Sequence, residues 1–257
     1  MNINDLSTQL MYTTTPIFGM KVDGSQVSGT GFIFSIFEDN DKSKSIPVLI
    51  TNYHVLENVV NGFIELSLGE NNMPVKGKSI RISFDSSVVK NRLGGLDLIA
   101  IPLAETLNSL EKNNINVFYR TISNDIIPNE SKVEELAALE QVTFIGYPSG
   151  LYDNHNKTSI IRQGITATPI WNDFKGEPIF LIDAGVFPGS SGSPVFIYNQ
   201  GSYATKDGIS IGNRILFVGI VSETILREGS TYLNLGRVIN SKAMYKELKN
   251  LISPYLE

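Results

Sequence analysis

The stretch that decides the fold is residues 183–194, which read DAGVFPGSSGSP. It joins two apolar runs, 179–182 (IFLI) and 194–197 (PVFI). Gly189 can adopt backbone angles that residues with a Cβ avoid, so successive N–H groups of this turn can point into one cavity. The N–H groups of Gly189 and Ser191 would then stabilise an oxyanion on a carbonyl attacked by the Ser191 hydroxyl. A plain polar β-turn explains the same residues, so this stretch alone does not distinguish a catalytic turn from a structural one.

The composition excludes several classes of protein. The chain has 257 residues, of which 42% are hydrophobic and 18% charged, enough for one large domain or two small barrels. A net charge of -5 and a pI near 5.2 argue against a nucleic-acid-binding surface. The chain contains no cysteine, which excludes disulfides, zinc–thiolate sites and cysteine nucleophiles. We expect no metal and no cofactor.

The first twenty residues do not resemble a targeting segment. They lack a basic region followed by an apolar core, so we expect no signal peptide. No apolar run approaches the roughly eighteen residues of a membrane span. We therefore expect a soluble, cytoplasmic protein without membrane contacts, unless the start of a longer chain has been trimmed.

Short apolar runs separated by turn residues make up most of the chain. The predicted strands are 32–37, 46–51, 63–68, 78–84, 98–101, 141–145, 159–169, 177–184, 193–198, 215–222 and 231–238. Residues 55–60 predict a short helical turn, 105–119 a weak helical face, and 124–140 a partly helical connection. This pattern predicts two antiparallel barrels or sandwiches.

A single longer helix is predicted at the end of the chain, capped by Asn240 or Ser241. Apolar residues recur there at helical spacing, at Met244, Leu248, Leu251, Ile252 and Tyr255. We interpret this stripe as a packing face rather than a site for a partner.

A serine hydroxyl needs a base at neutral pH, and histidine is the usual one. The chain has two histidines. His155 lies in a polar loop, whereas His54 ends an apolar strand, where a rigid scaffold would hold it. A carboxylate must orient the base, and Asp97 stands at the mouth of the apolar run 98–101.

The order of these residues discriminates between folds. No histidine follows Ser191, which excludes the α/β-hydrolase order of serine, acid and histidine. A subtilisin-like order needs helices alternating with parallel strands, and the predicted elements do not alternate. The order His54, Asp97, Ser191 is the one of chymotrypsin-like enzymes.

The chain resembles the trypsin-like (chymotrypsin-fold) serine peptidases, most closely the bacterial HtrA-like branch. Four stretches carry the resemblance: GTGFI at 29–33, LITNYHV at 49–55, LDLIAI at 96–101 and the nucleophile stretch 183–194. The resemblance implies an all-β fold of two six-stranded antiparallel β-barrels, at about 20–123 and 141–238, within a single peptidase domain. Residues 124–140 would connect the barrels, and a C-terminal helix would occupy 240–257.

The resemblance also assigns roles to individual residues. Ser191 would be the nucleophile, His54 the general base and then acid, and Asp97 the residue that orients His54. The amides of Gly189 and Ser191 would form the oxyanion hole. The Ser222 hydroxyl would support Asp97, and residues 222–224 would pair with an extended substrate as an added strand.

The substrate pocket departs from the trypsin pattern. The resemblance places its floor at Gly185 and Val186, neither of which is acidic, so we expect an uncharged residue before the scissile bond. Thr224 stands where many members have glycine, which would narrow the pocket. Residues 222–224, which include Glu223, complete the predicted substrate contacts.

Two further departures concern regulation. Ser190 replaces the acid that captures a freed N-terminus in digestive members, and no PDZ-like domain follows the peptidase stretch. We therefore expect a serine endopeptidase that forms an acyl-enzyme on a dedicated protein or peptide substrate. Its activity would be gated by a regulatory partner protein or a rearranged loop. The alternatives are a catalytically silent binding module of the same fold and a small-ester hydrolase.

Overall fold

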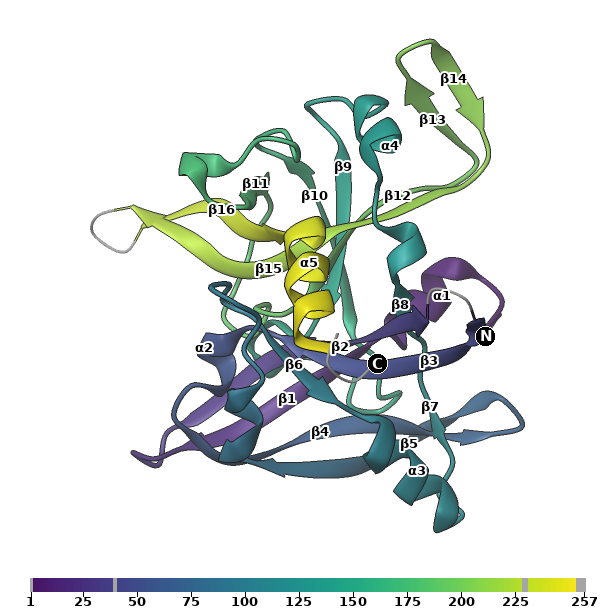
Figure 1. Ribbon diagram of the computed structural model, residues 1–257, viewed down its shortest axis with the longest axis vertical. Coiled ribbons are helices and arrows are strands. Elements are labelled where there is room, and N and C mark those ends of the chain that lie inside the picture. Colours follow the sequence, from purple (N-terminus) through teal and green to yellow (C-terminus); the bar gives the residue numbers. More distant parts are fainter. Residues whose placement is uncertain (1, 39–40, 228–230, 253–257) are drawn as a thin grey trace.

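The computed structural model describes residues 2–38, 41–227 and 231–252, and most of them lie in two β-rich lobes (Figure 1). The first lobe contains β1 (Thr14–Lys21), β2 (Gln26–Glu38), β3 (Asp41–Thr51), β4 (Val59–Glu70), β5 (Met73–Asp85), β6 (Ile99–Pro102), β7 (Val117–Phe118) and β8 (Ile122–Ser123). Strand β1 therefore begins before residue 20, where the sequence analysis places the start of this lobe.

The first lobe is one strongly curved sheet. Its main path has six strands in the order β5-β4-β1-β2-β3-β6, while β7 pairs with β4 and β8 runs parallel to β2. Among the described residues, no pairing between β5 and β6 closes the path. Apolar side chains from the sheet and from the loops around it fill its concave side, including Ile17, Leu49 and Ile64.

The second lobe is a closed barrel of six antiparallel strands, in the order β10-β11-β16-β15-β12-β9. These strands are β9 (Gln141–Gly146), β10 (Ile160–Thr166), β11 (Ile179–Asp183), β12 (Pro194–Asn199), β15 (Arg214–Arg227) and β16 (Thr231–Asn240). A two-stranded hairpin, β13 (Ser202–Thr205) with β14 (Gly208–Ile211), projects from the barrel (Figure 1).

The helices are short. They are α1 (Leu6–Met11), α2 (Tyr53–Leu56), α3 (Ala104–Lys112), α4 (Glu130–Glu134) and α5 (Ser241–Ile252), with 3₁₀ turns at Ser86–Lys90, Asn124–Ile126, Pro148–Gly150 and Phe174–Gly176. The turn at Asn124–Ile126 and helix α4 fall within the predicted connection 124–140. No helix in the described ranges has the length and apolar character needed to cross a bilayer.

A shared core joins the two lobes. Phe32, Phe34 and Ile50 of the first lobe pack in one cluster with Phe196 and Phe217 of the second. Burial of large aromatic side chains is among the strongest contributions to stability in a core. The relative position of the lobes is therefore set by apolar packing, and residues from both can contribute to one site.

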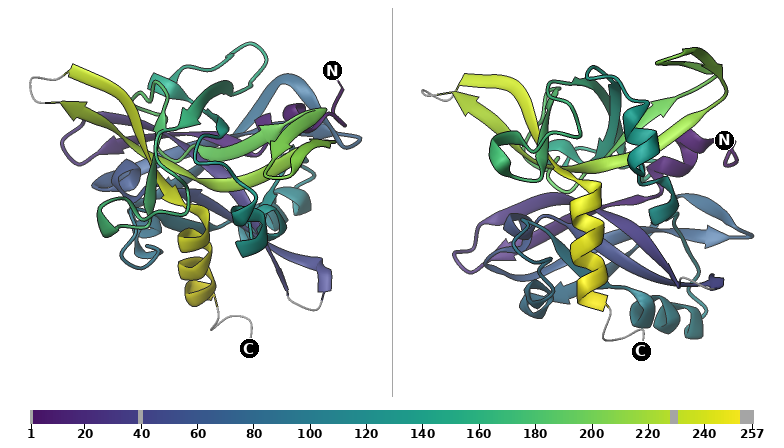
Figure 2. Two further views of the ribbon diagram at one scale, coloured as in Figure 1. Left: turned by 90° about the horizontal axis from the view of Figure 1, so that it is seen from above. Right: turned by 45° about the horizontal axis from the view of Figure 1, so that its top comes forward.

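Helix α5 lies against this shared core, as its apolar stripe predicts, and descends from the second lobe alongside the first (Figure 2). Met244 and Leu248 are fully buried. The Asn240 side chain accepts a hydrogen bond from the Lys242 N–H at 2.9 Å, which is the capping interaction expected there. Tyr255 of the predicted stripe lies outside the described residues.

These observations confirm the predicted fold class. The chain is mainly β, with one closed six-stranded barrel, a second sheet with six strands in its main path, and a C-terminal helix. It is consistent with a chymotrypsin-like double barrel.

Candidate active site

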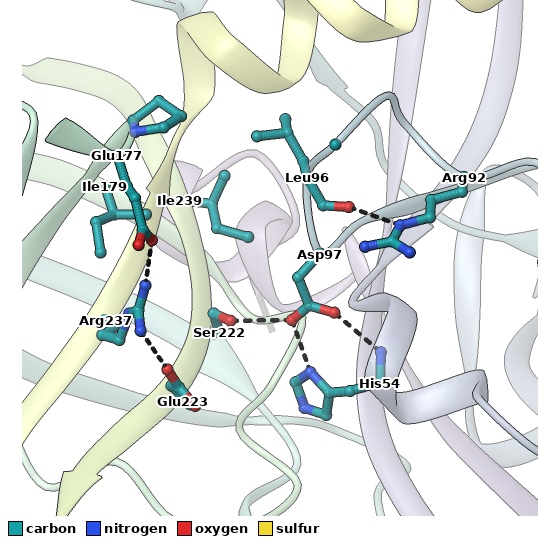
Figure 3. A pocket seen from close by; sticks show the side chains of 12 residues that line it. His54, Arg92, Leu96, Asp97, Glu177, Ile179, Ser222, Glu223, Arg237 and Ile239 are labelled. Carbon is teal, nitrogen blue, oxygen red and sulfur yellow. Dashed lines mark hydrogen bonds and ion pairs between the residues drawn. The ribbon is translucent and has the colours of Figure 1, made fainter.

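Asp97 and His54 form a hydrogen-bonded pair at the edge of the first lobe, facing the second (Figure 3). His54 Nδ1 lies 2.7 Å from Asp97 Oδ2, and the His54 backbone N–H donates to Asp97 Oδ1 at 3.0 Å. His54 belongs to helix α2, which follows β3. Asp97 lies two residues before the start of β6. A carboxylate at Nδ1 places the proton there and leaves the lone pair on Nε2.

Further hydrogen bonds hold the Asp97 backbone in place. The Tyr53 N–H and the Asn52 side-chain amide both donate to the Asp97 carbonyl, at 3.2 Å and 2.9 Å. The Ser222 hydroxyl of the second lobe donates to Asp97 Oδ2 at 3.0 Å. Asp97 is therefore fixed from both lobes.

The contacts of Asp97 with His54 lower the pKa of the Asp97 carboxyl. Burial alone raises the pKa of Asp97, but the hydrogen bond and the charge of His54, with smaller contributions from the His54 N–H and Ser222, outweigh it. The pKa of Asp97 therefore lies below its ordinary value, so Asp97 is ionised at neutral pH and can stabilise a protonated His54.

Ser191 is connected to this pair through Ser222 and not through a hydrogen bond to His54. Its hydroxyl donates to the Ser222 carbonyl at 2.8 Å, and no hydrogen bond within the described residues joins it to the imidazole. The link between Ser191 and Asp97 therefore runs through one residue, Ser222, whose carbonyl and hydroxyl face the two partners.

The nucleophile stretch forms a tight turn. The Ser190 N–H donates to the Phe187 carbonyl at 2.9 Å, and Gly189 has a φ of 84°. Proline at the second position and a positive φ at the third define a type II turn. The Ser149 N–H donates to the Pro188 carbonyl at 2.5 Å, which fixes the central peptide of the turn.

Two backbone amides of this turn are unpaired. Within the described ranges, neither the Gly189 N–H nor the Ser191 N–H has a hydrogen-bond partner, whereas the carbonyls of both residues accept one. Gly189 itself has no room for a side chain, because a Cβ there would lie 2.6 Å from the Tyr147 carbonyl. An oxyanion hole requires unpaired N–H donors of this kind.

Ser190 brings no charge to the turn. It is 1% exposed, and its hydroxyl accepts only a long hydrogen bond from the Phe187 N–H, at 3.4 Å. The backbone of the turn is therefore held by neutral contacts.

Strand β15 presents a free edge next to this turn. Its pairing with β12 ends at Ile220, while Glu223 and Thr224 remain paired with β16 on the other side. A strand with one unpaired edge can accept an extended peptide.

The predicted pocket floor is only partly open. Gly185 is half-buried, and a Cβ there would lie 3.0 Å from the Arg162 guanidinium. Val186 is 3% exposed and packs inside the second barrel, so it is closed to a ligand in this structure. Arg162 lies between the rings of Phe144 and Phe187, at 5.7 Å and 4.9 Å from their centroids.

A groove of about 500 Å³ runs from the His54–Asp97 pair toward the second lobe (Figure 3). Ser222, Glu223 and Arg237 line its far wall. The Arg237 guanidinium donates to Glu223 at 2.7 Å and to Glu177 at 2.6 Å. One cation thus bridges two carboxylates along the groove.

Sequence reasoning missed Arg162 and Arg237, because their distance from the recognised motifs along the chain hides their position beside the site. His155, which sequence reasoning set aside, has its N–H bonded to the Asp153 side chain within its own loop, and it does not line the groove.

The comparisons with known proteins give the family. The profile of the trypsin-like peptidase domain matches residues 29–203, more than half of the chain. This chain therefore belongs to the trypsin-like peptidase family. A search of curated proteins finds no match.

Solved structures agree on the fold. The HtrA-type protease AlgW with a tripeptide is 14% identical with a TM-score of 0.52, covering 96% of this chain and 62% of that one. The protease Anisep from Arthrobacter nicotinovorans is 14% identical with a TM-score of 0.52, covering 95% and 96%. A thermostable serine protease, AL20, from an extremophilic microorganism is 15% identical with a TM-score of 0.51, covering 92% and 95%. The chain thus spans less than two thirds of the AlgW chain.

Proposed function

We propose that the chain cleaves peptide bonds through an acyl-enzyme intermediate with His54, Asp97 and Ser191 as its catalytic triad. The observation that carries the proposal is that Ser222 joins the His54–Asp97 pair to Ser191, which lies in a turn where the N–H groups of Gly189 and Ser191 are unpaired. A turn with only a structural role would require neither an oriented imidazole nor unpaired amides.

The proposed reaction needs only these residues and water. The Ser191 oxygen attacks the substrate carbonyl while its proton passes to His54 Nε2, and the N–H groups of Gly189 and Ser191 bind the resulting oxyanion. The protonated His54 then gives its proton to the leaving amine as the C–N bond breaks. In the second half of the reaction, water attacks the acyl carbon while His54 takes its proton. The bond between the acyl carbon and the Ser191 oxygen then breaks as His54 returns this proton to that oxygen.

Substrate binding in this proposal uses the free edge of β15. Residues 222–224 would pair with the stretch before the scissile bond as an added strand, since the pairing with β12 ends at Ile220. AlgW, a protease of similar fold, was solved with a tripeptide. For this chain, the proposed substrate is a protein or peptide that pairs with the edge of β15 in an extended conformation.

Gated activity is supported by the position of the Ser191 hydroxyl. It donates to the Ser222 carbonyl, which in the proposed complex is an acceptor for the substrate backbone. Attack requires the hydroxyl to turn toward His54, and the same movement frees this carbonyl for the substrate. Substrate binding or a regulatory partner protein would then favour the active arrangement.

The residue before the scissile bond is proposed to be uncharged, because Gly185 brings no acid to the proposed pocket. The Arg162 guanidinium near Gly185 supports this proposal, because a second cation placed beside it would be repelled.

The decisive experiment is labelling by a fluorophosphonate probe. We expect the wild-type protein to be labelled and Ser191→Ala to remain unlabelled. A wild type that is neither labelled nor able to hydrolyse peptides would favour the silent binding module. Turnover of small esters without peptides would favour the ester hydrolase. Mapping protein N-termini made by the wild type but not by Ser191→Ala would identify the substrate.

A further inference from the structure

Thr30 lies in β2 of the first lobe, yet it binds the nucleophile turn of the second lobe at two points. Its N–H donates to the Ser191 carbonyl at 2.9 Å, and its hydroxyl donates to the Gly189 carbonyl, also at 2.9 Å. Thr30 is 0% exposed. The two residues that offer the unpaired N–H groups are therefore both held through their carbonyls by one residue.

The Thr30 hydroxyl both donates and accepts a hydrogen bond, and little space surrounds it. It also accepts the Tyr147 N–H at 3.0 Å. A Cβ on Gly146 would lie 2.6 Å from this hydroxyl, and a Cβ on Gly192 would lie 1.9 Å from the Thr30 carbonyl. Two segments of the second lobe, residues 146–147 and 189–192, thus close tightly around Thr30.

The first lobe holds Thr30 in turn. The Thr51 hydroxyl at the end of β3 donates to the Thr30 carbonyl at 2.7 Å, three residues before His54 in the sequence. The strand that leads to His54 and the turn that carries Ser191 are therefore both tied to Thr30.

We propose that Thr30 is a positioning residue for the oxyanion hole. Fixing the carbonyls of Gly189 and Ser191 limits rotation about the backbone of these residues, and so keeps their N–H groups directed at the substrate. Ser190 supplies no charge to anchor the turn. The two neutral hydrogen bonds from Thr30 hold it instead. The inference rests on the proposed function, because an oxyanion forms only if Ser191 attacks a carbonyl.

The test compares Thr30→Val, which loses the hydroxyl, with Thr30→Ser, which keeps it. Removing one oxyanion donor outright costs roughly 10²–10³ in kcat. We expect Thr30→Val to lose at least about tenfold in kcat with little change in KM, and Thr30→Ser to recover most of it. A peptide aldehyde, whose adduct carries the oxyanion, should bind Thr30→Val more weakly by the same factor. If Thr30→Val does not fold, Thr30→Ala takes its place, because it removes the hydroxyl without adding a methyl group beside Gly189. We expect the same loss of kcat in Thr30→Ala.

Thr15→Val is the matched control. Thr15 is also 0% exposed, and its hydroxyl donates to the Glu65 carbonyl at 2.7 Å and accepts the Glu65 N–H at 3.2 Å. It bonds to no residue of the nucleophile turn. We expect it to lower the melting temperature about as much as Thr30→Val while kcat stays near that of the wild type.

The outcomes separate the two proposals. An active wild type with undiminished kcat in Thr30→Val, or an equal kcat loss in Thr15→Val, would overturn the role of Thr30 alone. A wild type without labelling or turnover would remove the proposed function and this role with it.

Discussion

Asp97 illustrates how much of the proposed chemistry depends on single side chains. One carboxylate accepts hydrogen bonds from the His54 ring, the His54 backbone and Ser222. The first two fix the position and tautomer of the imidazole, and the third ties the pair to the lobe that carries Ser191. Replacing this carboxylate should therefore disturb catalysis far more than folding.

We expect Asp97→Asn to lower kcat by about 10³–10⁴-fold, because an amide no longer stabilises the imidazolium or selects its tautomer. Single-turnover acylation of a peptide ester measures the effect. Asn91→Asp, a change of one side-chain group outside the triad, is the control and should retain activity. Wild-type acylation rates in Asp97→Asn would contradict the triad.

The pH dependence of stability follows from the lowered pKa of Asp97. A carboxyl that ionises more readily when folded stabilises the protein above its unfolded pKa, near 3.8, and this contribution disappears as the pH falls through the lower folded pKa. In urea titrations, Asp97→Asn should be less stable than the wild type at pH 7. The difference should shrink below about pH 4, and a constant difference down to pH 2 would refute this account.

Arg162 should determine which side chains are rejected next to the scissile bond. We expect peptides with Lys or Arg at that position to be the poorest substrates, and Arg162→Gln to raise their kcat/KM relative to an uncharged peptide. A panel of peptides that differ only at that residue measures the ratio. Efficient cleavage after Arg by the wild type would show that Arg162 does not face the pocket.

At the scale of single elements, helix α5 contributes by packing. Met244 and Leu248 are fully buried against the core shared by the lobes, while Lys246 on the opposite face is exposed. The helix ends the described chain, but its apolar face completes the surface on which both lobes meet.

Leu248→Ala should lower the free energy of unfolding by about 2–5 kcal/mol, the usual cost of a cavity at a buried leucine. Urea unfolding followed by fluorescence measures this loss. Lys246→Ala is the control on the same helix and should change stability by less than about 0.5 kcal/mol. Equal effects of the two substitutions would mean that α5 does not pack as described.

At the scale of the whole molecule, the two lobes share one apolar core. Phe217 of the second lobe lies 5.5 Å from Phe32 and 6.2 Å from Phe34 of the first, centroid to centroid. The Glu65 carboxylate of β4 also contacts Tyr152 and Lys157 of the second lobe. Such contacts favour unfolding of the lobes as one unit.

We expect the wild type to unfold in a single transition by calorimetry, and Phe217→Ala to cost about 3–5 kcal/mol. Ile211→Ala is the control, because Ile211 is 91% exposed on the projecting hairpin, and it should leave the transition in place. Two separate transitions in the wild type would show that the lobes are independent.

The sequence alone determined the fold class, the order of the three proposed catalytic residues and the packing face of α5. Each of these depends on residues that are close together in the sequence. Short apolar runs predict strands, glycines around a serine predict a tight turn, and apolar residues at helical spacing predict a buried face. Such signals depend on neighbours along the chain, so they can be read without coordinates.

Only the tertiary structure decided the contacts between distant segments. Thr30 lies 159 residues before Gly189, Arg162 reaches Gly185 from another strand, and Val186 turns into the barrel interior instead of an open pocket. The direction of the Ser191 hydroxyl, toward Ser222 rather than His54, is decided in the same way. Side-chain direction and long-range pairing depend on how the two lobes pack, and no local pattern in the sequence encodes that arrangement.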